Sequence, residues 1–165
     1  MDTTVGWNFG VRTVAVAEKN GIAAAVLKNI FHFCGRDDYH VIEYGEPLPP
    51  DTAKPVLLLC TEMAGIDFAK WAVCIVEQEL SKDVVDSAKR ITFSLKRNDA
   101  DFTARNIRAT PDGYVAFELV GFGVIGRVRL TGGDIAKVGS VLAAACAAIG
   151  CGIPFADVLT VLDQN

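Results

Sequence analysis

The sequence predicts a three-layer α/β domain, in which a mostly parallel sheet is flanked by helices and continued by a small antiparallel ribbon. In the first half of the 165 residues, apolar runs of strand length alternate with segments of helical periodicity. Two of these runs, "PVLLLC" and "WAVCIV", are apolar throughout, as is typical of parallel strands covered on both faces. From about residue 100 to residue 130, polar and apolar residues alternate between glycine-containing turns, which indicates the ribbon.

The composition is that of one folded domain. Hydrophobic residues make up 51% of the chain, enough for a substantial core, and no linker or repeat divides residues 1–165. The net charge of -4, without any run of Lys or Arg, argues against a nucleic acid or an anionic membrane as partner. No stretch approaches the roughly 20 apolar residues of a membrane helix, and the acidic start is unlike a secretion signal. We therefore expect a cytoplasmic protein.

The first strand and the first helix are separated by an Asn-Gly turn. A β-branched run predicts the strand over Thr13–Ala17. The helix is expected to end at Gly35, and its apolar residues recur at helical spacing: Ile22, Val26, Leu27, Ile30, Phe31 and Cys34. This order of strand, turn and helix is that of a phosphate-binding loop.

Further strands are expected at "YHVIEY", "PVLLLC", "WAVCIV" and "RITFSL". Ser81 is expected to cap a short helix between the last two, with Asp83 and Asp86 in its first turn. About ten proline-rich residues separate the first two, too few for a crossover between parallel neighbours. Either these strands are not neighbours or one sheet face has lost its helix. An uncovered apolar face would need another cover, which predicts a homodimer.

The C-terminal part returns to helix after the ribbon. One long helix is expected to have an apolar stripe formed by Ile135, Val138, Val141, Leu142, Cys146 and Ile149. The run "AAACAA" within it permits close packing, and "GCGIP" separates it from a last short helix, "FADVLTVL".

The Asn-Gly turn resembles the "VTGTNGKTT" loop of the Mur ligases, ATP-dependent amide ligases of peptidoglycan precursor synthesis. "VAEKNGIAA" (Val16–Ala24) aligns with it without a gap and shares Asn20 and Gly21. A working loop needs glycines around the phosphates, a lysine on their oxygens and a hydroxyl on Mg²⁺. The resemblance implies that this chain holds only the shape of the loop.

The chemical groups of that loop are replaced. Glu18 stands at the first glycine position and Ile22 at the lysine position, and alanines stand at both hydroxyl positions. A carboxylate thus occupies the place of polyphosphate, and the cation that would attract polyphosphate is absent. The resemblance implies a vestigial nucleotide loop made of six residues: Glu18, Lys19, Asn20, Gly21, Ile22 and Ala23.

Four more segments resemble the central domain of these ligases, in the same order. "HVIEYGEPLP" is similar to the "EMG" segment of the dipeptide-adding members, and Glu43 falls on its metal-binding glutamate. "KPVLLLCTEMAGIDF" keeps Thr61, but Glu62 replaces the family's asparagine. "RITFSLKRNDADFTARNI" is the closest match.

The fourth segment is the ribbon and the helix after it. This helix segment departs from the family, because Asp134, Ile135 and Val138 stand at its histidine and two asparagine positions. Contacts to adenine and phosphate from this helix are expected to be absent.

The resemblance covers nearly the whole chain, but only the central domain of a ligase. Because the lysine, the hydroxyls, the histidine and the asparagines of the family are replaced, we expect no catalytic residue and no cofactor. Glu43 is the one candidate metal ligand. We therefore expect a catalytically inactive relative that serves as a binding or interaction module. The alternative is a residual nucleotide-binding component, or part of an ATP-dependent amide ligase that other chains complete, with ATP and Mg²⁺ as cofactors.

A third hypothesis is a pocket for another small molecule at the carboxyl edge of the sheet. Glu18, Asn20, Glu43 and Glu62 would line it. Such a pocket would be acidic and would suit a cation or an amine better than ATP.

Overall fold

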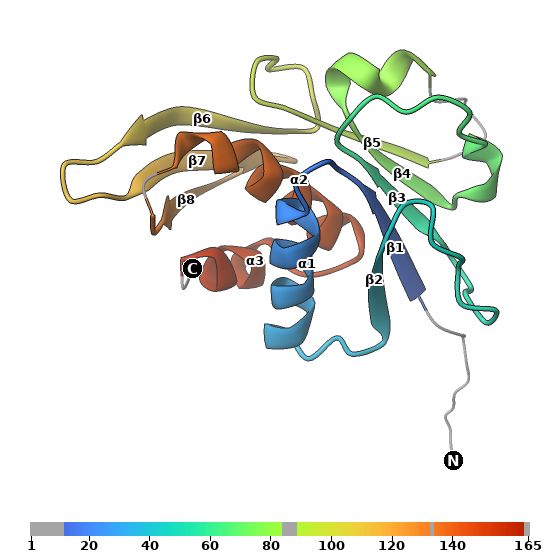
Figure 1. Ribbon diagram of the computed structural model, residues 1–165. Helices are drawn as coiled ribbons and strands as arrows, with labels where there is room; N and C mark the ends of the chain where they lie inside the picture. The colour runs from blue at the N-terminus through green and yellow to red at the C-terminus, as the bar shows by residue number, and fades with distance from the viewer. Residues whose placement is uncertain (1–11, 84–88, 133, 164–165) are drawn as a thin grey trace.

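The described strands form one eight-stranded sheet with the order β2-β1-β3-β4-β5-β6-β7-β8 (Figure 1). A computed structural model describes residues 12–83, 89–132 and 134–163. The strands are β1 (Arg12–Ala17), β2 (Tyr39–Glu43), β3 (Val56–Leu59), β4 (Val73–Glu77), β5 (Lys89–Ser94), β6 (Phe102–Ala109), β7 (Val115–Gly121) and β8 (Val124–Leu130). The helices are α1 (Ile22–Phe33), α2 (Val138–Gly150) and α3 (Phe155–Leu162), with 3₁₀ helices η1 (Phe68–Lys70), η2 (Gln78–Asp83) and η3 (Ile135–Lys137).

Strand directions confirm the predicted parallel sheet with an antiparallel ribbon. All pairs from β2 to β6 are parallel, whereas β6, β7 and β8 pair antiparallel. The ribbon is joined to the sheet where Thr92 of β5 meets Asp101. The Asp101 carboxylate accepts the Thr92 N–H at 2.9 Å, and the Asp101 N–H donates to the Thr92 hydroxyl at 3.0 Å. These reciprocal bonds hold the start of β6 beside β5.

The position of β1 explains the short link between β2 and β3. β1 lies between them and pairs with both, so β2 and β3 are not neighbours. The first of the two explanations given for the short proline-rich link is therefore correct. No helix is needed there, because the link does not join adjacent parallel strands.

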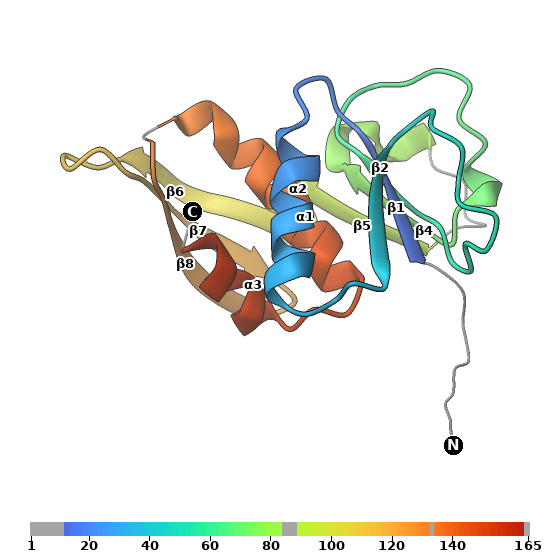
Figure 2. The ribbon, with the colours of Figure 1, turned by 60° about the horizontal axis from the view of Figure 1, so that its bottom comes forward.

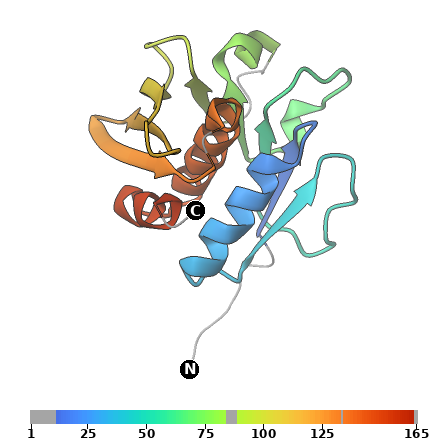
Figure 3. The same ribbon diagram turned by 60° about the vertical axis from the view of Figure 1, so that its left-hand side comes forward.

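The three α-helices lie on one face of the sheet (Figures 2 and 3). α2 is buried almost throughout, as its run of small residues predicts, and it packs against α1, α3 and strands β4 to β6. Ile135 does not belong to its apolar stripe, because it lies in η3 and is 49% exposed. None of the described helices has both the length and the apolar character needed to cross a membrane.

Loops and 3₁₀ helices cover the other face of the central parallel strands β1, β3 and β4. Leu57, Leu59 and Cys74 on that face are buried, with Trp71 beside them. Side chains of the connecting segments pack against this cluster: Leu48, Ile66, Phe68 and Leu80. The open apolar face from which we predicted a homodimer is thus not found in the described part of the chain.

The prediction that Ser81 caps a helix is wrong. The helix η2 begins at Gln78, directly after β4, and Ser81 lies inside it. The Ser81 hydroxyl donates back to the Gln78 carbonyl at 2.8 Å instead of accepting an N–H at a helix start. Asp86 lies outside the described residues.

Gly121 provides a test of the joint between the ribbon and the sheet. A Cβ at this position would lie 2.2 Å from the ring of Phe102, which is fully buried. We expect Gly121→Ala to lower the free energy of unfolding by about 1–3 kcal/mol through overpacking. Each kcal/mol should lower the melting temperature by about 2–4 °C.

Gly139→Ala is the matched control, because its Cβ would come no closer than 3.4 Å to Leu95. Alanine also favours the helix over glycine by about 1 kcal/mol. Thermal unfolding that shows equal losses for both variants would contradict the packing of Phe102 over Gly121.

Candidate functional site

The carboxyl ends of β1, β3, β4 and β5 meet at one edge of the sheet, where a cleft of about 280 Å³ opens. This edge is where open α/β sheets bind their ligands. The cleft lies between the turn before α1 and the first turn of α2. It is lined by Glu18, Lys19, Asn20, Cys60, Thr61, Glu77, Phe93, Ser94, Leu95, Ala136, Gly139 and Ser140.

The turn before α1 has the geometry of an anion-binding loop. Gly21 has a φ of 73°, a conformation that glycine adopts without the strain a Cβ would cause. The Asn20 side chain accepts the Ile22 N–H at 3.0 Å and fixes the turn. The first N–H groups of α1 therefore point toward the cleft, as they do toward phosphates in functional loops.

The Glu18 carboxylate occupies the position in front of these N–H groups. One of its oxygens accepts the Ala23 N–H at 2.7 Å, and the other accepts the Ser140 hydroxyl at 2.6 Å. A helix N-terminus stabilises an anion there through unpaired N–H groups and the helix dipole. In this chain the anion is one of its own side chains, and it ties α1 to α2.

The charge around the cleft is predominantly negative. Burial raises the pKa of the Glu77 carboxyl, and the neighbouring Glu79 raises it further. Burial also raises the pKa of the Cys60 thiol, with Glu18 and Glu77 adding to the effect. Lys19 is the one cationic side chain in the lining, and it is exposed to solvent.

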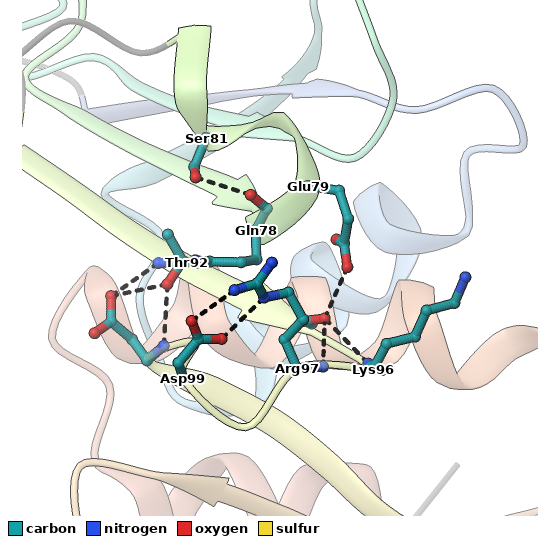
Figure 4. Close-up of polar contacts among 9 residues, drawn as sticks. Gln78, Glu79, Ser81, Thr92, Lys96, Arg97 and Asp99 are labelled. Atoms are coloured by element: carbon teal, nitrogen blue, oxygen red, sulfur yellow. Dashed lines mark hydrogen bonds and ion pairs between the residues drawn. The ribbon is translucent and has the colours of Figure 1, made fainter.

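Hydrogen bonds between side chains and backbone N–H groups order the wall of the cleft at the end of β5 (Figure 4). The buried Ser94 hydroxyl donates to Glu79 at 3.1 Å and accepts the N–H groups of Lys96 and Arg97, each at 3.0 Å. The Arg97 guanidinium makes two bonds to Asp99, at 3.0 and 2.8 Å. Ser94 is therefore not a free nucleophile, and Arg97 is engaged by a carboxylate rather than poised over the cleft.

The structure brings together the predicted loop residues but not the other predicted acids. Glu18, Lys19 and Asn20 line the cleft, while Gly21, Ile22 and Ala23 form the turn and the start of α1. Glu43 ends the edge strand β2, where its N–H donates to Glu46 at 2.6 Å. Glu43 and Glu62 are exposed and outside the lining, so the predicted pocket of four residues does not form as expected.

A metal ion at Glu43 stays a prediction. Among the residues that the structure describes, no group of three or more His, Cys, Asp or Glu side chains could hold a metal.

Two residues of the cleft were missed by the sequence analysis. Glu77 is the last residue of β4, and its place directly after the apolar run "WAVCIV" was a usable signal. Ser140 lies 122 residues from Glu18 and reaches it only through the packing of α2, so no local pattern could have identified it.

Comparison with known proteins establishes the fold. No protein-family model matches the sequence, and no curated protein matches it significantly. Among solved structures, the UDP-N-acetylmuramoylalanyl-D-glutamyl-2,6-diaminopimelate–D-alanyl-D-alanyl ligase of Acinetobacter baumannii has 16% identity and a TM-score of 0.71, over 93% of this chain and 46% of that one. A MurF ligase of Thermotoga maritima, solved with ADP, has 15% identity and a TM-score of 0.66, over 92% and 48%.

A pseudomurein peptide ligase of Methanothermus fervidus is also similar, with 15% identity and a TM-score of 0.58 over 96% of this chain and 50% of that one. The chain therefore has the fold of a Mur ligase central domain, and the resemblance predicted from the sequence is confirmed at the level of fold. It spans about half the length of these ligases.

Removal of the Glu18 carboxylate tests its role at the helix N-terminus. Glu18→Ala should lower the free energy of unfolding by about 1.5–3 kcal/mol, since hydrogen bonds to a charged group are lost and the Ala23 N–H loses its partner. Glu43→Ala removes an exposed carboxylate and should cost less than about 0.5 kcal/mol. Chemical denaturation that gives equal values for the two would contradict this role.

The raised pKa of Glu77 predicts how stability changes with pH. The unfolded chain releases this proton first as the pH rises, so the free energy of unfolding falls between the ordinary glutamate pKa and the raised one. Glu77→Gln removes that loss and should raise the melting temperature at neutral pH, but not at a pH below the ordinary pKa. The exposed Glu62→Gln is the control. A gain of the same size at both pH values would refute the assignment.

Proposed function

We propose that this chain is a catalytically inactive relative of the Mur ligase central domain and serves as a binding or interaction module that does not use ATP. The observation that carries this proposal is the Glu18 carboxylate on the first turn of α1. The place that phosphate takes in a functional loop is filled by a side chain of the protein itself.

Polyphosphate would meet unfavourable charge at this position. It would have to displace Glu18 from Ala23 and Ser140, or lie beside it. Two unit charges of the same sign 4 Å apart repel by about 1 kcal/mol in water and about 4 kcal/mol near a protein surface. Ile22 at the lysine position offers no compensating cation, and the fully buried Ala23 offers no hydroxyl for Mg²⁺.

The positions before and at the start of α2 support the same proposal. Asp134 uses its carboxylate to accept the Ala136 N–H at 2.9 Å and so caps η3. Ile135 is an exposed apolar side chain, and Val138 is fully buried. The Asp134 carboxylate is thus engaged by its own helix, and Ile135 and Val138 have no hydrogen-bonding group in their side chains.

The predicted cytoplasmic location and homodimer belong to this proposal. The first argument for a dimer was an uncovered sheet face, and the chain covers that face itself. A second copy would have to use another surface. Light scattering on the purified protein measures the mass and decides the oligomeric state.

Residual nucleotide binding is the second candidate, and the intact turn favours it. Asn20 and Gly21 keep the loop geometry, and the cleft beside them is open. In that case the chain would be a nucleotide-binding part of an amide ligase that other chains complete, with ATP and Mg²⁺ as cofactors.

Thermal unfolding with and without millimolar MgATP separates the two candidates. We expect no change in melting temperature for the natural sequence. A ligand at about 100 times its Kd would add about 2.7 kcal/mol, and each kcal/mol would raise the midpoint by about 2–4 °C. A rise of several degrees would establish the second candidate instead.

The variant Glu18→Gly with Ile22→Lys is the positive control. It removes the internal carboxylate and returns the cation of the loop, so we expect a measurable rise with MgATP. A rise in this variant and none in the natural sequence would trace the loss of ATP binding to these two positions.

A further inference from the structure

The outer face of the β6–β8 ribbon gathers four exposed arginines, which we call the arginine face: Arg105, Arg108, Arg127 and Arg129. The ribbon extends to one side of the parallel strands (Figure 1). Across the register, Arg105 and Arg127 flank Glu118, and Arg108 and Arg129 flank Ala116. The chain as a whole carries a net charge of -4, so this face is opposite in sign to the rest of the protein.

A β-bulge places Arg105 and Arg108 on the same face. Residues three apart in a regular strand point to opposite faces. The register shifts between Arg105 and Arg108, which pair with Glu118 and Ala116, so one extra residue is accommodated on β6. Asn106 in the bulge has a φ of 54°, which is uncommon outside glycine. The bulge therefore turns Arg108 toward the other three arginines.

Arg108 and Arg129 contact neutral groups of the ribbon, and Arg129 also acts on the exposed Asp112 carboxyl, whose pKa is lowered by a hydrogen bond from Thr110 and further by this arginine. The Arg129 guanidinium lies 4.2 Å from the centre of the Tyr114 ring, and Arg108 donates to the Asn106 carbonyl at 2.8 Å. Asn106 also donates to the Glu118 carboxylate at 3.0 Å. In the described part of the chain, the ion pairs are Arg36–Asp38 and Arg97–Asp99, so the arginine face takes part in none. The guanidiniums of Arg108 and Arg129 are thus oriented before an anion binds, without an ion pair in the described part of the chain.

The arginine face is hollowed. A groove of about 1080 Å³ is lined by Arg108, Arg127 and Arg129, with Tyr114 and Asn106 beside them and Asp163 at one end. This volume is at the upper end of the range for ligand sites, about 300–1,000 Å³. The groove is large enough for a segment of polypeptide.

The edge of β8 is available beside the groove. In the described sheet β8 pairs with β7 alone. The Arg129 N–H donates to Asp163 at 3.3 Å, so it points away from β7. Because backbone groups alternate in direction along an antiparallel strand, those of Ile125 and Arg127 point outward too. An exposed strand edge of this kind is a template for another strand.

We propose that the arginine face binds an acidic, extended segment of a partner protein, which adds to the edge of β8 as a further strand. Carboxylates of the segment lie beside Arg127 and Arg129, because residues opposite each other on paired strands have neighbouring side chains. Asp163 already caps the Arg129 N–H and so limits the pairing at that end.

A peptide fits this face better than a nucleic acid or an anionic membrane. Glu118 in the middle of the face and Asp163 at its end would repel a row of phosphates. A peptide paired with the outer edge of β8 is separated from Glu118 of β7 by the width of β8. The hollow shape also suits an inserted segment better than a flat lipid surface. The inference deepens the proposed function, since it names what the module binds.

Fluorescence anisotropy with a labelled peptide that alternates glutamate and valine tests the proposal. We expect the natural protein to bind this peptide and to ignore a peptide that alternates lysine and valine. Arg127→Glu with Arg129→Glu should weaken binding by about tenfold or more, since both charges change sign. Lys89→Glu with Arg90→Glu is the matched control, because it changes the net charge equally at two exposed positions on β5. It should change binding less than about twofold.

Hydrogen exchange distinguishes strand addition from loose attraction. The glutamate peptide should protect the amides of Ile125 and Arg127. No binding by the natural protein, equal weakening by both double variants, or no protection of β8 would each overturn the proposal. A different result would assign the face to a membrane instead. In that case the natural protein would not bind the peptide but would sediment with phosphatidylserine vesicles, and the Arg127→Glu, Arg129→Glu variant would not sediment with them. Each of these outcomes is independent of MgATP binding, so the two proposals fail separately.

Discussion

The rest of the structure depends on the packing of α2 between α1 and the sheet. Its residues from Ala143 to Ala148 are fully buried, which requires small side chains on all sides of the helix. Because these side chains are short, α1 and the strands approach closely, and one helix contacts both the parallel strands and β6 of the ribbon. The same packing brings Ser140 to Glu18. The core and the candidate site therefore share one cause.

The cleft at the carboxyl ends of the parallel strands and the outer face of the ribbon carry charge of opposite sign. At the cleft, an internal carboxylate satisfies the N-terminus of α1, and Glu77 and Glu79 add further negative charge. On the ribbon, Arg108 and Arg129 are oriented by neutral groups and form no ion pair within the described residues. A fold that binds nucleotide at its carboxyl edge needs the reverse arrangement at that edge. The turn at Asn20 and Gly21 has the backbone expected of such a loop, while Ile22 and Ala23 stand where its lysine and its first hydroxyl would be. Fold alone does not determine function.

In the described residues the second face of the parallel strands carries no α-helix, yet it is not open. Loops that carry Leu48, Ile66 and Phe68 supply the apolar cover, and Trp71 closes the cluster. Burial of apolar area is favourable whichever kind of backbone supplies it, at about 25 cal/mol per Å². The surfaces left for partners are therefore edges and charged faces rather than a bare apolar sheet.

The sequence by itself determined the parallel sheet, the ribbon and the turn at Asn20 and Gly21. It also placed Glu18 where a phosphate-binding loop has a glycine. Each of these features follows from local periodicity or from one short motif. Glu77 was missed, although its place at the end of β4 could have indicated it. Only the tertiary structure decided that Glu18 meets Ser140, that β1 separates β2 from β3 and that loops cover the second face of the central parallel strands. Arg105 and Arg108 lie on the same face of the ribbon because of a β-bulge, which no local sequence pattern indicates. These outcomes depend on contacts between distant segments, and local sequence carries no record of which distant side chain will complete a site.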